Sequence, residues 1–237
     1  MSNLVDSKRM NPHAADAAAH PDYHVALSAA IVLVCAVAFA VLAFTAHSVT
    51  LFSFDLPIMQ ALQNFNPPWF DVPMHVVNWM GFGAQAITLV SVVVLGMFIA
   101  RWRWEAVVTA IDAATIWGIN VLIGDIVKRV PPSPAEVGQV FLDLTHPSFP
   151  SGHVNSYIAI YGFAAYLVYK KVEQPWLRIP LLVFFGALIL LIGPSRPYMG
   201  RHFPSDVLGS IFLGIIWLVF TLYLYQWGKG RFFKRHA

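Results

Sequence analysis

The chain has 237 residues, of which 58% are hydrophobic and only 11% are charged, and its formal net charge is +3. Soluble domains carry roughly 25% charged residues, so this composition excludes an ordinary water-soluble domain and indicates a membrane protein. The small basic excess does not point to nucleic acid, because basic residues at the cytoplasmic ends of membrane helices are expected to face anionic lipid.

Six apolar stretches follow one another along the chain. A helix needs about 20 apolar residues to cross a bilayer. The first stretch holds no charged residue, the third holds two aspartates, and the fourth and fifth are short enough to need flanking residues from the loops. We therefore predict an all-α protein, a six-transmembrane-helix bundle. The predicted spans are residues 25–46, 76–100, 106–127, 154–169, 176–192 and 207–227.

The two ends of the chain are polar. Residues 1–24 are predicted to be a flexible cytoplasmic tail, residues 25–227 a single membrane domain, and residues 228–237 a basic cytoplasmic tail. A signal peptide is the rival interpretation of the first span. Its apolar run exceeds the 7–15 residues of a typical signal core, so an uncleaved anchor is favoured.

The segment between the first two spans mixes apolar and polar residues. In residues 54–70 the apolar positions recur near helical spacing, which predicts a short interfacial helix in the outer membrane boundary. A loop that covers the bundle is the alternative.

The distribution of basic residues predicts the orientation, because lysine and arginine are retained in short cytoplasmic loops. With both termini in the cytoplasm, cytoplasmic segments hold eleven of the fifteen basic residues. The other four fall in two outward loops, which suggests that these loops bind an anion, although ordinary scatter is the alternative. These four are Lys128, Arg129, Arg196 and Arg201.

Two histidines in the outward loops have the residues around them that phosphate chemistry needs. His202 and Asp206 lie four residues apart in the stretch SRPYMGRHFPSD, so a helix that starts near His202 places both on one face. The carboxylate of Asp206 is then expected to accept the proton of one ring nitrogen and leave the other free to attack phosphorus. His202 is the predicted nucleophile, forming a transient phosphohistidine.

The remaining parts of a phosphate site are supplied by nearby residues. Arg196 offers a planar fork that grips two phosphate oxygens. Ser151 and Gly152 precede the fourth span, where a hydroxyl and unpaired backbone N–H groups can face an anion. His153, the last residue of the tetrapeptide PSGH, is the predicted acid that protonates the leaving oxygen.

A metal site or cofactor is not indicated by the sequence. The single cysteine, Cys35, lies inside the first span, and the chain has no paired-cysteine or HExxH motif. We expect chemistry without a metal or cofactor.

These residues resemble the type 2 phosphatidic acid phosphatase (PAP2) superfamily. Its second motif, PSGH, is matched by residues 150–153. Its third motif, SR-x5-H-x3-D, is matched by Ser195, Arg196, His202 and Asp206. The resemblance covers roughly residues 120–214 and the six-span plan. It implies a metal-independent membrane lipid phosphatase whose third-motif histidine is the nucleophile, whose aspartate orients it and whose second-motif histidine is the acid.

The family's first motif, K-x6-R-P, is degenerate here. When its proline is aligned with Pro132, Gly124 replaces the lysine and Pro131 replaces the arginine. Neighbouring bases are expected to substitute, although two of them lie close enough to Asp125 to pair with it on the helix. The residues expected to bind the substrate phosphate are Ser151, Gly152, Ser195 and Arg196, with Lys128, Arg129 and Arg201 as the substitutes.

The sequence therefore predicts an enzyme of the cytoplasmic membrane that removes phosphate from a lipid phosphate or diphosphate on the extracytoplasmic side. Phosphatidate, phosphatidylglycerol phosphate, a polyprenyl diphosphate and a phosphorylated glycolipid are the candidate substrates. The alternatives are a lipid phosphotransferase and a catalytically silent protein that binds or transports lipid phosphates. Membrane lipids are the expected partners, and the oligomeric state is left open.

Overall fold

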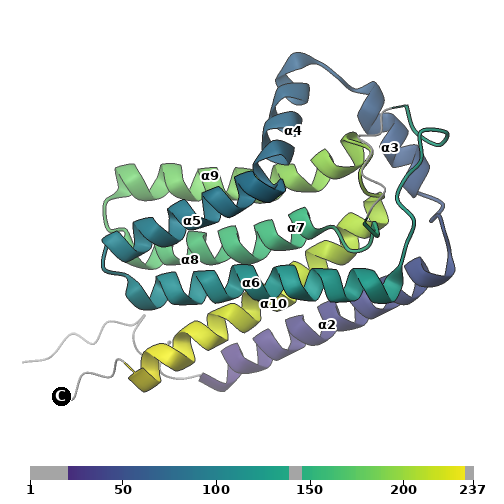
Figure 1. Ribbon diagram of the computed structural model, residues 1–237. Helices are drawn as coiled ribbons and strands as arrows, with labels where there is room; N and C mark the ends of the chain where they lie inside the picture. The colour runs from purple at the N-terminus through teal and green to yellow at the C-terminus, as the bar shows by residue number, and fades with distance from the viewer. Residues whose placement is uncertain (1–20, 139–145, 233–237) are drawn as a thin grey trace, which may run out of the picture.

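The computed structural model describes residues 21–138 and 146–232, and the regular structure within these two ranges is helical (Figure 1). This confirms the predicted all-α class. The helices are α2 (Pro21–Ser48), α3 (Asp55–Asn64), α4 (Pro68–Met80), α5 (Gly83–Ile99), α6 (Arg103–Val127), α7 (Gly152–Ser156), the π-helix η1 (Tyr157–Tyr161), α8 (Gly162–Lys171), α9 (Pro175–Tyr198) and α10 (Pro204–Phe232).

Four of the described helices are long and apolar enough to cross a bilayer, namely α2, α6, α9 and α10. Helices α4 and α5 form a fifth candidate, but they are bent by 77° relative to each other. The predicted fourth span is divided among α7, η1 and α8, which follow one another without a break. The count of six spans therefore stays a prediction.

The segment between the first two spans holds two helices where the sequence predicted one. The predicted helix of residues 54–70 is present as α3, but it ends at Asn64. Pro67 and Pro68 follow, and a proline excludes the residue before it from the helical region, so the chain restarts as α4 with Pro68 in its first turn. Figure 1 shows α4 standing away from the long helices, at a steep angle to α5.

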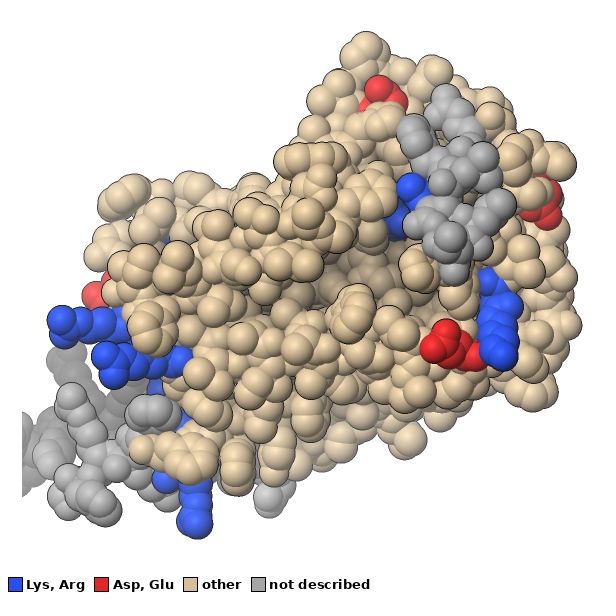
Figure 2. Space-filling view, in the orientation of Figure 1, with Lys and Arg blue, Asp and Glu red and all other residues tan. Residues whose placement is uncertain are grey.

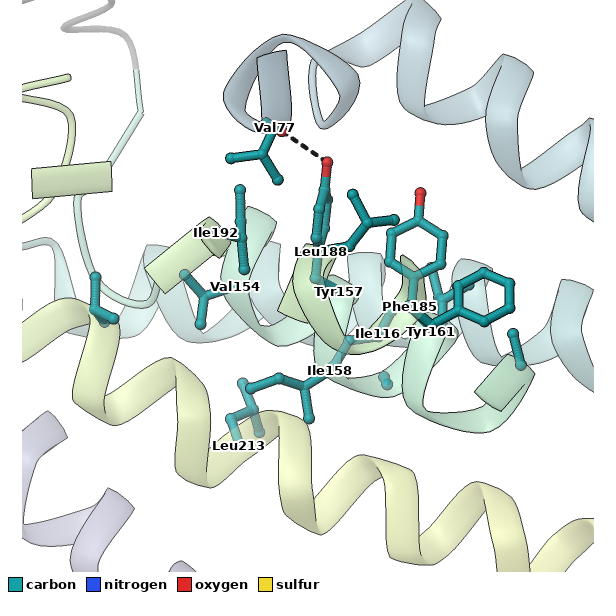
Figure 3. Packing of buried hydrophobic residues seen from close by; sticks show 14 of the residues in the cluster. Val77, Ile116, Val154, Tyr157, Ile158, Tyr161, Phe185, Leu188, Ile192 and Leu213 are labelled. Carbon is teal, nitrogen blue, oxygen red and sulfur yellow. Dashed lines mark hydrogen bonds between the residues drawn. The ribbon is translucent and has the colours of Figure 1, made fainter. Parts of the chain in front are cut away.

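The centre of the bundle is packed around η1. The Tyr157 hydroxyl donates to the backbone carbonyl of Val77 in α4 at 2.8 Å, and the ring of Tyr161 stacks on Phe185 of α9 with centroids 5.8 Å apart (Figure 3). Ile158 and Leu213 join η1 to α10 in the same cluster. Because η1 is fixed on three sides, α7 at its start is held beside the bend between α4 and α5.

The start of α2 and the end of α10 lie at one end of the bundle, and α3 lies at the other (Figure 1). Figure 2 shows lysine and arginine side chains gathered at the end where α10 finishes. Helix α2 begins at Pro21 and α10 continues to Phe232, so the helices extend past the predicted tail boundaries at 24 and 228. The rest of both predicted tails, residues 1–20 and 233–237, lies outside the described residues.

Candidate active site

A turn at a glycine ends α9 and reverses the direction of the chain toward the bundle. Gly200 has a φ of 64°, in the left-handed region that favours glycine. Its N–H donates to the Pro197 carbonyl at 3.0 Å, and the N–H of Arg201 donates to the Arg196 carbonyl at 3.1 Å. These two bonds form a Schellman motif, which ends the helix and places His202 directly after the turn.

The ring of His202 is oriented by a backbone carbonyl. Its Nδ1 lies 2.6 Å from the Ser148 oxygen, and because a carbonyl can only accept, Nδ1 carries the proton and donates it. Asp206 Oδ2 is farther away, at 3.9 Å. The predicted hydrogen bond from the His202 ring to Asp206 is therefore replaced by one to Ser148. The chemical result is the same, since Nε2 keeps its lone pair.

Asp206 is engaged with the start of its own helix. Its Oδ2 accepts the Phe203 backbone N–H at 2.9 Å, as the third helical residue does in a capping box, and Pro204 occupies the first helical position. Its Oδ1 accepts from the guanidinium of Arg129. Each carboxylate oxygen thus has a partner other than His202.

Arg129 lies in the protein interior rather than in a phosphate site. It is 3% exposed and bridges Asp206 to Asp55, whose Oδ2 it contacts at 2.8 Å. Asp55 in turn accepts from the backbone N–H and the hydroxyl of Ser205, at 2.9 and 2.8 Å. Arg129 therefore joins α3 to the first turn of α10, and the alternative that it pairs with Asp125 is also wrong.

Two other predicted phosphate ligands point away from the site. Lys128 ends α6 in a left-handed conformation with φ 53°, and its side chain is exposed. Ser195 is buried and donates to the Ile192 carbonyl of its own helix at 2.9 Å. Neither residue lines the cavity described below.

Arg196 is held at the site by an asparagine that the sequence analysis did not identify. The arginine is 3% exposed, and its Nη1 donates to Asn78 Oδ1 near the end of α4. Its Nε is buried without a hydrogen-bond partner. Asn78 lies inside the predicted second span, residues 76–100, and no motif marked it as a partner of Arg196.

His153 occupies the bend between α4 and α5. Its ring meets Phe82 edge to face, with centroids 5.3 Å apart. A Cβ on Gly81 would lie 2.2 Å from the ring, so only glycine leaves room for the imidazole there. Nε2 of His153 is buried and has no hydrogen-bond partner.

Ser151 and Gly152 lie directly before His153. The N–H of Ser151 is used internally, donating to Ser210 Oγ at 2.6 Å, while its own Oγ is buried without a partner. A Cβ on Gly152 would be 3.0 Å from Asn120 Nδ2 of α6. The absent side chain therefore makes room for Asn120, a further cavity residue that the sequence analysis did not identify.

A cavity of about 820 Å³ brings these groups together. His153, Arg196, Arg201 and His202 line it, so the structure brings the two histidines and two of the predicted arginines to one site. The guanidinium of Arg201 lies over the ring of Phe82, 5.3 Å from its centroid. Gly124 and Pro131, which stand where the family's first motif has its lysine and arginine, line the same cavity.

The cavity continues between α5 and α6 as an apolar groove. Its walls there include Ile87 and Val90 of α5 and Trp117 and Val121 of α6. Ile87 and Trp117 are 69% and 70% exposed, so the groove opens sideways at the surface of the bundle. Figure 2 shows a recess in this face. The cavity thus combines a basic end with a lateral opening of the kind that an acyl chain fills.

The electrostatics favour a neutral His202. Burial lowers the pKa of His202 well below its ordinary value, and the positive charge of Arg196 lowers it further. A neutral imidazole is the form that has a lone pair to donate. Within the residues that the structure describes, no group of three or more His, Cys, Asp or Glu side chains is arranged to hold a metal ion.

Comparisons with known proteins agree with this geometry. A family model for the PAP2 superfamily matches residues 83–229. Phosphatidylglycerophosphatase B of Bacillus subtilis (strain 168) is 29% identical over 184 residues, which cover 75% of this chain and 86% of that protein. Undecaprenyl-diphosphatase BcrC of the same organism is 42% identical over 69 residues, covering 29% of this chain and 31% of that protein.

Two solved structures are similar in fold. The crystal structure of a transmembrane PAP2-type phosphatidylglycerolphosphate phosphatase from Bacillus subtilis matches with a TM-score of 0.70 at 25% identity, over 87% of this chain and 98% of that chain. The crystal structure of Aquifex aeolicus LpxE matches with a TM-score of 0.53 at 20% identity, over 74% of this chain and 98% of that chain. The second likeness concerns the fold alone.

Proposed function

The chain belongs to the PAP2 superfamily, and on that premise we propose that it hydrolyses a lipid phosphate through a phosphohistidine at His202, on the extracytoplasmic side of the cytoplasmic membrane. It is a multi-pass membrane protein and a lipid phosphatase of the PAP2 type. Phosphatidylglycerol phosphate is the substrate we propose first, because the relative that matches most of the chain is named for that activity.

One observation carries this proposal. Two residues that line the cavity, His153 and Arg196, each have a buried side-chain nitrogen without a hydrogen-bond partner, Nε2 and Nε. Buried polar groups are nearly always paired, so two unpaired nitrogens at one site call for a missing partner. A phosphate in the cavity has oxygens to accept from both.

The proposed reaction has two steps. Nε2 of His202 attacks phosphorus, the bond from phosphorus to the lipid oxygen breaks, and His153 gives its Nε2 proton to that oxygen. The negative phosphate favours the protonated form of His153. A water molecule then attacks the phosphohistidine, His153 takes up its proton, and inorganic phosphate leaves. Arg196 and Arg201 hold the charge that the phosphoryl oxygens carry throughout.

The arrangement of the cavity supports a lipid as the leaving group. The basic end lies where α9 turns toward α10, and the apolar groove runs from it between α5 and α6 to the lipid-facing surface. A substrate anchored in the bilayer then reaches His202 without leaving the membrane. The extracytoplasmic location rests on the excess of basic residues at the opposite end of the chain's spans.

A panel of lipid phosphates tests the function. Purified protein is assayed with phosphatidate, phosphatidylglycerol phosphate, a polyprenyl diphosphate and a phosphorylated glycolipid, each with a chelator present. We expect inorganic phosphate from phosphatidylglycerol phosphate and unchanged rates with chelator. Labelled phosphate that passes to another lipid would instead indicate a phosphotransferase. Tight binding of these lipids without phosphate release from any of them would indicate a silent binding protein.

A further inference from the structure

A second cavity, of about 460 Å³, lies between the ends of α8 and α10 that are remote from the active site. Two tyrosines, one glutamine and one glycine contribute to its walls, and three lysines from the two helices converge on it. Within the residues that the structure describes, no carboxylate lines it. The lining residues are Tyr166, Lys170, Lys171, Tyr225, Gln226, Lys229 and Gly230.

Two of the three lysines are held in place by buried groups. Glu105 and Tyr225 are 4% and 3% exposed, and the Tyr225 hydroxyl donates to Glu105 Oε1 at 2.8 Å. Lys171 Nζ pairs with the same carboxylate oxygen at 2.5 Å, and Lys229 Nζ donates to the Tyr225 hydroxyl at 3.1 Å. These contacts fix ammonium groups that would otherwise sample many rotamers, so a ligand binds them at a smaller entropic cost.

The charges do not cancel within this cluster. Of the three lysines that line the cavity, one, Lys171, pairs with a carboxylate, that of Glu105, which also accepts from Tyr225. An excess of two positive charges remains beside the cavity. A phosphate group supplies the complementary charge and enough acceptor oxygens for several ammonium donors.

The cavity lies at the level where the bundle would meet the membrane surface. Large aromatic side chains are exposed around it, with Tyr169 and Tyr223 at 61% and 69% and Trp227 at 53%. Such residues are enriched at membrane–water boundaries. Figure 2 shows basic side chains gathered at this same end. Basic pockets between membrane helices on the cytoplasmic side bind anionic lipid headgroups.

We infer that the cavity bounded by Lys170, Lys171 and Lys229 is a second phosphate-binding site, separate from the catalytic one. Its ligand is a phosphate-bearing anion, either the headgroup of an anionic membrane lipid or a free phosphate. The ammonium groups are the charged part of the cavity wall, so a lipid ligand places its phosphate against them and leaves its chains along α8 and α10.

A double substitution with a matched control tests this site. Lys170→Gln with Lys229→Gln removes two charges from the cavity and keeps both partners of the Lys171–Glu105 ion pair. The control, Arg101→Gln with Arg178→Gln, removes two charges outside the cavity lining. The full chain is purified in detergent and titrated with dihexanoyl phosphatidylglycerol or with inorganic phosphate, and bound molecules are counted by native mass spectrometry.

We expect the unchanged protein and the control to bind one more phosphatidylglycerol than the lysine variant, whose affinity for that molecule falls at least about tenfold. If only inorganic phosphate shows this lysine dependence, the site takes a free anion. Equal losses in both variants, or no loss in either, would overturn the proposal. Phosphatase activity of both variants on a short-chain substrate reports that the distant active site is folded.

Discussion

The guanidinium of Arg129 contacts the carboxylate of Asp206, so a buried cation holds the aspartate that follows the proposed nucleophile by one helical turn. The same guanidinium reaches Asp55 in α3, and the backbone carbonyl of Arg129 accepts the N–H of Ser148 at 2.9 Å. Ser148 in turn orients the ring of His202. One residue therefore supports both groups that determine the geometry of His202, without lining the cavity.

Replacing Arg129 tests this supporting role. Arg129→Gln leaves two carboxylates buried with no cation between them, and the loss of one partner from a buried pair costs about 3–5 kcal/mol. We expect a lower thermal unfolding temperature in detergent and a lower kcat. The exposed neighbour provides the control, since Lys128→Gln should change neither. A raised KM with unchanged stability would instead make Arg129 a phosphate ligand.

The acid role of His153 predicts a dependence on the leaving group. His153→Ala should lower kcat/KM about 10²–10⁴-fold for an alkyl lipid phosphate, because the departing alkoxide then lacks a proton donor. An activated aryl phosphate, whose leaving group needs no proton, should lose far less. Rates measured on both substrate types check this. Equal losses would remove His153 from the acid role.

We propose Arg201 as the substitute for the missing first-motif bases, because it lines the cavity and Lys128 and Arg129 do not. Arg201→Gln should raise KM about tenfold to a hundredfold, as expected for one lost charged contact. Adding Gly124→Lys to the Arg201→Gln protein should partly restore the affinity for the substrate. A Cβ at Gly124 meets its nearest neighbours only at 3.7 Å or more, and the residue lines the cavity, so the position accepts a Cβ beside open space. No recovery in the double variant would show that position 124 does not reach the phosphate.

The protonation of His202 can be followed directly. Because burial and Arg196 lower its pKa, the ring should remain neutral at about pH 6.5, where a free histidine is half protonated. The reactive neutral form is lost only when the pH falls through the lowered pKa. Arg196→Gln removes a positive charge, so the pKa of His202 should rise and its neutral form should be lost at a higher pH. Ring nitrogen NMR shifts, assigned with His202→Ala, measure both values.

The sequence motifs predicted which residues would come together, because the residue types suited to phosphate chemistry follow from residue type and spacing. His153, Arg196 and His202 all line one cavity as expected. The long apolar runs also identified the all-α class. These features depend on local composition, which a single sequence records directly.

The contacts around that centre could not be predicted, because they join residues far apart in the chain. Asp55 and Arg129 are separated by 74 positions, and Asn78 and Arg196 by 118. Arg129 looked like a phosphate ligand because its neighbours in sequence are outward loop residues. Only the packing of α3 against α10 shows that its charge is already neutralised inside the protein. The capping role of Asp206 likewise depends on where α10 begins.

The central claim is that His202 becomes covalently phosphorylated during turnover. The most direct measurement uses protein incubated briefly with a radiolabelled lipid phosphate, quenched in alkali and digested, with the label located by mass spectrometry. The account predicts an alkali-stable, acid-labile phosphoryl group on His202 and none on the His202→Ala protein, which should also release no phosphate. Sustained turnover by His202→Ala, or label on another residue, would contradict it.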